Sequence, residues 1–321
     1  METVAPLWLW AVFVAFVLAA LFVDFVVLKK QGAHEVGVRE AINWSILWVA
    51  LSFVFNGLVW WAVKDTTGSV TVANEKSLEF LTGYLIEKSL AVDNIFLFLM
   101  IFTYFAVPPA YQKRVLMIGI IGAIVLRSIM ILVGGWLLAQ FHWILYVFGA
   151  FLILTGVKMW WAAGQEADLE DNPALKLLRK VMPVSRNFDG ENFFTVENGK
   201  RIATPLLMVI ALVGLTDVIF AVDSIPAIFA ITTDPFIVLT SNVFAILGLR
   251  AMYFLLQAVA SRFHLLNYGL AVILVFIGTK MVIVDFYKIP VLVSLAVVVG
   301  ILVTTMVLST RTAPQTTNPH H

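Results

Sequence analysis

The sequence contains no cysteine among its 321 residues and only five histidines. Without cysteine the chain cannot form disulfides, thiolate metal sites or thiol redox relays. Charged residues are also scarce, at 13% of the chain, whereas apolar residues make up 61%. A soluble domain carries about 25% charged residues. The composition therefore indicates a membrane protein with several spans, and the net charge of +1 gives no indication of a nucleic-acid partner.

Sequence motifs of common enzymes are missing as well. We find no Walker sequence, no Gly-rich loop after a strand, and no Ser, His and Asp in an order typical of a hydrolase. His34, His142 and His264 are scattered without the spacing of metal ligands. We therefore expect neither an enzyme, nor an ATP-driven pump, nor an organic cofactor.

Apolar runs of about 20 residues, the length that crosses a bilayer, are frequent. We predict an all-α membrane protein with about nine transmembrane helices, near residues 7–28, 41–63, 78–105, 114–138, 143–161, 204–230, 236–258, 266–286 and 290–309. The N-terminus has no basic segment before its first apolar run, so we expect the first helix to be retained. Residues 310–321 form a tail whose ending, NPHH, resembles the remnant of a purification tag.

Basic residues are unevenly distributed between the two sides that these spans define. Thirteen of the 21 Lys and Arg residues fall in loops on one side, and only Lys64, Lys76 and Lys288 fall on the other. Because short loops rich in Lys and Arg stay in the cytoplasm, we expect the N-terminus outside and the C-terminus inside. Residues 162–203 then form a cytoplasmic loop. We interpret it as a solvated linker with a short amphipathic helix, and a regulatory or docking role is the alternative.

The chain also contains an internal repeat. The segment EKSLAVDNIF at 87–96 matches DVIFAVDSIP at 217–226, and TGVKM at 155–159 matches IGTKM at 277–281. Arg127 lies between the two segments of the first copy, and Arg250 lies between the two segments of the second. Residues 78–161 and 204–286 thus form two repeats of three spans each, and an odd number of spans makes the second copy inverted. Residues 1–65 and 290–309 supply the spans outside the repeats. Inverted repeats are typical of transporters, which bind substrate at the repeat interface near the midplane.

Each repeat contributes two acidic residues to an apolar span, Glu87 and Asp93 in the first and Asp217 and Asp223 in the second. A carboxylate at the bilayer centre costs at least about 2.5 to 3.5 kcal/mol, so such residues indicate function. Residues six apart lie about 120° apart around a straight helix. We therefore expect helix breaks near 89–94 and 223–226, the latter because Pro226 lacks an N–H.

Asn94 and Ser224 accompany these acids, which completes a ligand set made only of oxygen atoms. Such ligands suit hard cations such as Mn²⁺, Mg²⁺ and Ca²⁺. The alternative is that the acids form structural ion pairs with Arg127 and Arg250. Asp24, in the first span, is an entry ligand, a proton acceptor or only an interfacial anchor. Lys88 either pairs with its neighbour Glu87 or acts as a tethered countercharge.

The stretches TGYLIEKSLAVDNIF, DVIFAVDSIPAIFAITTDPF and GLAVILVFIGTKM are similar to the TerC family of bacterial integral membrane proteins. The resemblance covers nearly all of residues 1–310. It implies export of Mn²⁺, and it maps the acidic residues of the family onto Glu87, Asp93, Asp217 and Asp223. Gly214 departs from the family, because related sequences have a Glu at that position.

The carboxylates in the apolar spans predict a secondary transporter of a hard cation, and the resemblance implies that it carries Mn²⁺ out of the cytoplasm across the bacterial inner membrane. We expect exchange for protons, because carboxylates crowded in a medium of low dielectric repel one another and hold protons once the metal has left. The alternative is a membrane scaffold or metal-delivery partner in a tellurium or metal-stress resistance complex. Protein partners are not predicted.

Overall fold

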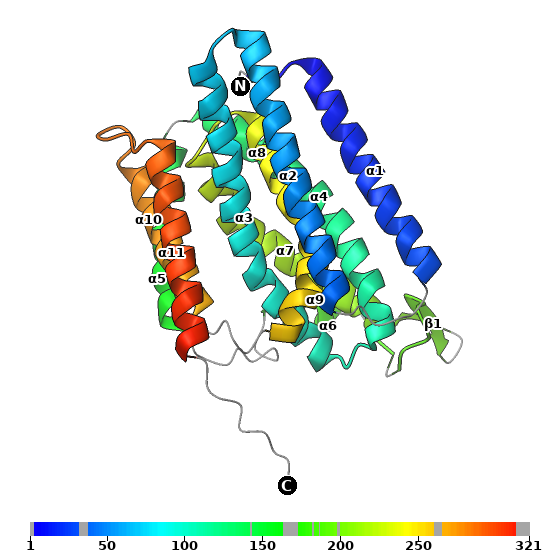
Figure 1. Cartoon of the computed structure of the whole chain (residues 1–321). Coiled ribbons are helices and arrows are strands. Elements are labelled where there is room, and N and C mark those ends of the chain that lie inside the picture. Colours follow the sequence, from blue (N-terminus) through cyan, green and yellow to red (C-terminus); the bar gives the residue numbers. More distant parts are fainter. Residues whose placement is uncertain are drawn as a thin grey trace.

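The computed structural model of the chain describes residues 3–31, 38–141, 143–162, 173–181, 183–185, 187–197, 200–259 and 265–312. Within these residues the protein is built mainly of helices, most of which run along the long direction of one bundle (Figure 1). The helices are α1 (Leu7–Gln31), α2 (Val38–Thr67), α3 (Val70–Tyr104), α4 (Pro109–Gln140), α5 (Ile144–Ala162), α6 (Pro173–Val181), α7 (Pro205–Phe229), α8 (Pro235–Leu247), α9 (Leu249–Val259), α10 (Leu266–Val282) and α11 (Val291–Thr312). Lipid offers no hydrogen-bond partner, so apolar segments satisfy their backbone groups as helices.

Each predicted span coincides with a helix, and the run at 236–258 corresponds to α8 and α9 together. Among the described residues, six helices are long and apolar enough to cross a membrane, or seven spans if α8 and α9, bent by 42°, count as one. α3 carries six charged residues and α10 has only 17 residues, so neither meets the same standard. The protein is therefore a multi-pass membrane protein, and nine crossings remain a prediction.

The helices pack across two consecutive groups, α3 to α5 and α7 to α10. α3 packs against α8, α4 against α7, and α5 against α10. The largest apolar cluster joins α3, α4, α7 and α9 through residues such as Ile95, Leu116 and Tyr253. Figure 1 shows α5, α10 and α11 together along one side of the bundle and α1 at the opposite side.

Small residues bring α5 and α10 into backbone contact. A Cβ atom on Gly278 would lie 2.6 Å from the carbonyl oxygen of Gly149, and one on Gly156 would lie 2.7 Å from that of Ala271. Larger side chains at these positions would force the helices apart. Close approach of this kind is how membrane helices gain packing contacts without a hydrophobic driving force.

The predicted breaks near 89–94 and 223–226 are wrong. α3 runs without interruption through the first region, and α7 continues through Pro226 to Phe229. A proline removes one helical hydrogen bond, but Pro226 lies in the last turn of α7, where few bonds follow it. Its neighbours Ile225 and Ile228 are buried and hold the segment in place. The observed interruption lies instead at Gly248, between α8 and α9.

The loop between the two groups contains a short helix and a hairpin. α6 is strongly amphipathic, as predicted, and it packs against α7 with Leu175 buried. Strands β1 (Phe194–Glu197) and β2 (Lys200–Ala203) pair antiparallel, with Thr195 opposite Ile202. The hairpin was not predicted, although the pair Asn198 and Gly199 between its strands is typical of a turn. Residues 198 and 199 of that turn lie outside the described residues.

Candidate functional site

Arg127 is the centre of the buried charge cluster. It lies on α4 and is 2% exposed. Its guanidinium contacts Asp217 of α7 through Nη2–Oδ1 at 2.9 Å and Nε–Oδ2 at 3.4 Å, and Nη1 donates to Ser224 Oγ at 3.2 Å. Nη1 also forms an ion pair with Glu87 of α3. One cationic side chain therefore joins residues from both predicted repeats.

The acidic side of this cluster exceeds its basic side. Glu87 is 0% exposed and Asp217 is 6% exposed. Apart from the ion pair with Arg127, neither oxygen of Glu87 has a hydrogen-bond partner among the described residues. Two carboxylates around one guanidinium carry a net charge of −1 when both are ionised. Buried charge without full compensation is costly, so the cluster favours the binding of a proton or another cation.

A small cavity adjoins the cluster. Its volume is about 40 Å³, and its polar lining consists of Asn94, Arg127, Thr155 and Ser224, contributed by α3, α4, α5 and α7. Roughly 10 to 15 Å³ suffices for one water molecule, so the cavity can hold a water or a small cation. Its location between the two helix groups is the place where the sequence predicted the binding site.

Two of the predicted ligands cannot be placed. Asp93 lies on α3 and Asp223 on α7, but their side chains lie outside the described part of the structure. Within the described residues, no group of three or more Asp, Glu, His or Cys side chains could hold a metal ion. Of the six predicted ligands, the structure thus brings Glu87, Asp217 and Ser224 together through Arg127 and places Asn94 beside them.

The two arginines of the repeats have different partners. Arg127 pairs with acids of both repeats, as the ion-pair alternative predicted. Arg250, on α9, pairs instead with Asp24 of α1, with Nη2 and Oδ1 2.7 Å apart. Asp24 is 6% exposed. It is therefore a buried partner of Arg250 and not a side chain extended to the interface.

Lys88 does not pair with its neighbour Glu87. Its ammonium donates to the carbonyl of Ala245 in α8 at 3.2 Å. Gly214 lies on α7, three residues before Asp217, and a Cβ atom there would meet no atom within 4 Å. The Glu that the family resemblance predicts at this position is absent here, and the space that its Cβ atom would occupy is open.

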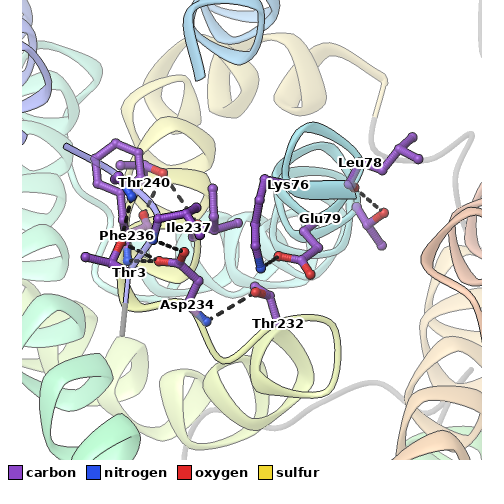
Figure 2. Close-up of polar contacts among 12 residues, drawn as sticks. Thr3, Lys76, Leu78, Glu79, Thr232, Asp234, Phe236, Ile237 and Thr240 are labelled. Carbon is purple, nitrogen blue, oxygen red and sulfur yellow. Dashed lines mark hydrogen bonds and ion pairs between the residues drawn. The ribbon is translucent and has the colours of Figure 1, made fainter. Parts of the chain in front are cut away.

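Several polar residues outside the predicted set are also buried. Asp234 caps α8 by accepting from the Phe236 N–H at 3.0 Å, and it accepts from Thr3 Oγ1 at 2.8 Å (Figure 2). Figure 2 also shows the Lys76–Glu79 ion pair on α3. The dipeptide Asp-Pro before an apolar run signals such a cap. The pairing of Asp234 with Thr3 joins residues far apart in sequence, and no local pattern predicts it.

Asn242 was missed as well. It lies on α8 and is 0% exposed, and neither its amide oxygen nor its amide nitrogen has a hydrogen-bond partner among the described residues. An amide within the apolar run of residues 235–247 was the available signal.

The model of the integral membrane protein TerC family matches residues 72–317. A Salmonella typhi protein is 57% identical over 310 residues, 97% of this chain and 96% of its own length. Its Escherichia coli K12 counterpart is 58% identical over 309 residues, 96% of each chain. Both are named Alx and described as a proposed membrane-bound redox modulator.

A Rickettsia bellii membrane protein without an assigned function is 38% identical over 293 residues, 91% of this chain and 94% of its own length. No solved structure matches the chain. Neither the family description nor these names indicates a catalytic activity, so the chain is not assigned to an enzyme class. The matches cover the chain almost from end to end, and the protein belongs to the TerC family of integral membrane proteins.

Proposed function

We propose that this protein is a secondary transporter that carries Mn²⁺ out of the cytoplasm in exchange for protons. The observation that carries the proposal is the buried cluster of Glu87, Arg127 and Asp217 beside a polar cavity. A membrane protein has no structural need for a buried excess of negative charge, because an apolar core of the same shape would be at least as stable. The excess therefore favours a cationic substrate.

The donor atoms favour a hard divalent ion. Glu87, Asn94, Asp217 and Ser224 offer only oxygen atoms and one amide nitrogen, and the chain has no thiolate. Carboxylate and carbonyl oxygens suit Mn²⁺, Mg²⁺ and Ca²⁺. Asp93 and Asp223, on the same two helices, are the further carboxylates of the proposed site. The choice of Mn²⁺ among these ions comes from the resemblance to the TerC family.

We further infer an inverted repeat, with α3 to α5 equivalent to α7 to α10. The sequence match equates Gly156 with Gly278, and therefore Gly149 with Ala271. Under this equivalence the approach of Gly278 to Gly149 is the counterpart of the approach of Gly156 to Ala271. The packing of α3 on α8 is likewise the counterpart of that of α7 on α4. Such reciprocal contacts support a pseudo-two-fold axis, about which transporters alternate access to a midplane site.

We place the protein in the bacterial inner membrane, with nine crossings and the N-terminus outside. The asymmetry of Lys and Arg supports this orientation. In it, the Gly68 turn and the α8 cap at Asp234 are on the outer side, and α6 with the hairpin is on the cytoplasmic side.

The names of the relatives suggest a redox role, which can be reconciled with transport. This chain has no cysteine, so it cannot exchange disulfides. An exporter of Mn²⁺ would instead change the pool of a redox-active metal in the cytoplasm. The alternative of a scaffold or metal-delivery partner predicts no transport by the isolated protein.

Reconstitution tests the proposal directly. Purified protein in liposomes that contain a manganese-sensitive dye should admit Mn²⁺ at a rate well above that of empty liposomes. Asp217→Asn should abolish this flux, and Asp189→Asn, which alters an exposed loop carboxylate, should not. A wild-type protein that is folded in the liposomes and gives no flux above background would refute the transporter and favour the scaffold.

A further inference from the structure

The break between α8 and α9 is a second polar feature within the bundle, apart from the Arg127 cluster. The two helices meet at Gly248 with a bend of 42°. Ala245 lies in the last turn of α8, where helix carbonyls lack partners from a following turn. These carbonyls also carry the negative end of the helix dipole. A half-helix end of this kind is where transporters coordinate a coupling cation such as Na⁺.

In this chain a side chain occupies the place at the helix break where such a cation would bind. Lys88 reaches from α3, and its Nζ atom donates to the Ala245 carbonyl at 3.2 Å. The same Nζ lies 6.0 Å from the centroid of the Tyr84 ring, within reach of a cation–π contact. No ion pair joins Lys88 to a carboxylate of the described residues. The ammonium is therefore held by carbonyl and aromatic groups, the groups that would otherwise hold a free monovalent cation.

The residue at position 248 leaves space for this ammonium. A Cβ atom on Gly248 would lie 2.5 Å from Lys88 Nζ and 3.2 Å from Trp48 Cβ. Glycine at 248 therefore leaves the space that the ammonium occupies. Under the inferred repeat, Lys88 corresponds to Val218, and Gly248 to a position within α4, which is unbroken. The lysine and the break thus meet at the contact of α3 with α8, and the counterpart contact of α7 with α4 has neither.

We propose that the α8–α9 break is a monovalent-cation site that the chain fills with its own Lys88 ammonium. The tethered cation excludes Na⁺ and K⁺ from the transport cycle and leaves protons as the exchanged ion. Lys88 is in this sense a residue that determines the specificity for the coupling ion. This role rests on the transport function proposed above, whereas the occupancy of the site by a cation does not.

Chemical rescue tests the site. Lys88→Ala removes three methylene groups and the ammonium, which together have the size of n-propylammonium. Propylammonium chloride should raise the melting temperature of Lys88→Ala in detergent, whereas 1-propanol, its neutral counterpart, should not. Wild type should not respond, because its site is filled. Lys280→Ala, which removes another buried lysine, in the last turn of α10 and apart from the α8–α9 break, should not respond either. Equal effects of propylammonium and 1-propanol would overturn the proposal.

Transport tests the role in coupling. In liposomes free of Na⁺ and K⁺, the Mn²⁺ flux of Lys88→Ala should be at least about tenfold lower than that of the wild type. Addition of propylammonium or Na⁺ should raise the flux of this variant several-fold. Lys88→Met keeps the volume without the charge, so it should lose flux and respond to neither cation. Wild-type flux from Lys88→Met would overturn the coupling role. A wild type without flux would refute the proposed function alone, because the melting-temperature result needs no transport.

Discussion

At the scale of single residues, Arg127 would compete with a metal in the proposed site for the same carboxylates. It neutralises part of the charge on Glu87 and Asp217 in the empty site, and a bound divalent cation would take over that role. We therefore expect the guanidinium both to stabilise the metal-free protein and to set the free energy that a metal must supply to bind.

We expect Arg127→Gln to destabilise the protein by about 3 to 5 kcal/mol, the usual effect of removing one partner from a buried ion pair. Added Mn²⁺ should recover much of this loss, because the two carboxylates left behind need a cation. Melting curves in detergent with and without MnCl₂ measure both effects. Arg250→Gln, which removes the partner of Asp24, is the control. An equal response to Mn²⁺ in both variants would contradict this account of Arg127.

Asp93 and Asp223 are the residues on which the proposed ligand set depends most. Asp93→Asn and Asp223→Asn each keep the size of the side chain and remove its charge, so both should abolish Mn²⁺ transport and leave the protein in the membrane. The measurement is the manganese content of cells that express each variant, with membrane abundance checked on the same samples. Either variant lowering cellular manganese as the parent does would show that the proposed ligand set is wrong.

Residues of the cluster were predictable because charge stands out in an apolar span. Glu87, Arg127 and Asp217 were all identified in this way, and the internal repeat indicated that they belong together. Their mutual arrangement was not predictable, since pairing depends on which faces of three helices meet. Arg250 illustrates this limit: it matches Arg127 in the repeat, yet its partner is Asp24 on α1, outside the repeats altogether.

At the scale of helices, the positions of apolar segments follow from length and composition, and the predicted spans coincide with helices for this reason. The break at Gly248 was not predicted, because a glycine in an apolar run is a weak signal beside the proline at 226. The structure shows that the surrounding side chains decide whether a helix is interrupted at such a residue. Pro226 is held by buried residues near a helix end, whereas Gly248 faces the ammonium of Lys88 and the side chain of Trp48.

The contact between α5 and α10 gives a prediction at this scale. Gly278→Ala would place a Cβ atom 2.6 Å from the Gly149 carbonyl oxygen, so we expect a loss of about 1 to 3 kcal/mol, the usual effect of overpacking. Gly122→Ala, on α4, meets no atom within 4 Å and should be neutral. Thermal unfolding in detergent compares the two. Equal stability of both variants would mean that the backbones are not held together as closely as described.

At the scale of the whole molecule, the distribution of Lys and Arg predicts which loops face the cytoplasm. The lack of native cysteine makes this simple to test. A cysteine introduced at position 170, within the predicted cytoplasmic loop, should not react with an impermeant maleimide in intact cells but should react after lysis. A cysteine at Asp65, an exposed position in the last turn of α2 on the predicted outer side, should react in both. Labelling of position 170 in intact cells would reverse the orientation and the direction of transport with it.

The proposed coupling to protons would also be a property of the whole molecule, because an empty site would have to return across the membrane. In the proposed site, the carboxylates left without metal would lie close together in a medium of low dielectric, and like charges so placed favour protonation. Arg127 compensates one of them, and Arg250 is engaged by Asp24. We therefore expect the empty transporter to return carrying protons, so that Mn²⁺ leaving the cytoplasm exchanges for protons entering it.

Proteoliposomes with a pH-sensitive dye measure this exchange. Movement of Mn²⁺ should acidify the compartment that the metal leaves, and an imposed proton gradient should drive Mn²⁺ in the direction opposite to proton flow. Collapse of the gradient by a protonophore should stop this driven transport while binding of Mn²⁺ persists. Flux that follows only the membrane potential and ignores the imposed gradient would indicate a uniporter. In that case the carboxylate cluster would remain the metal site, but its excess negative charge would have to be balanced during the return by a cation other than the proton.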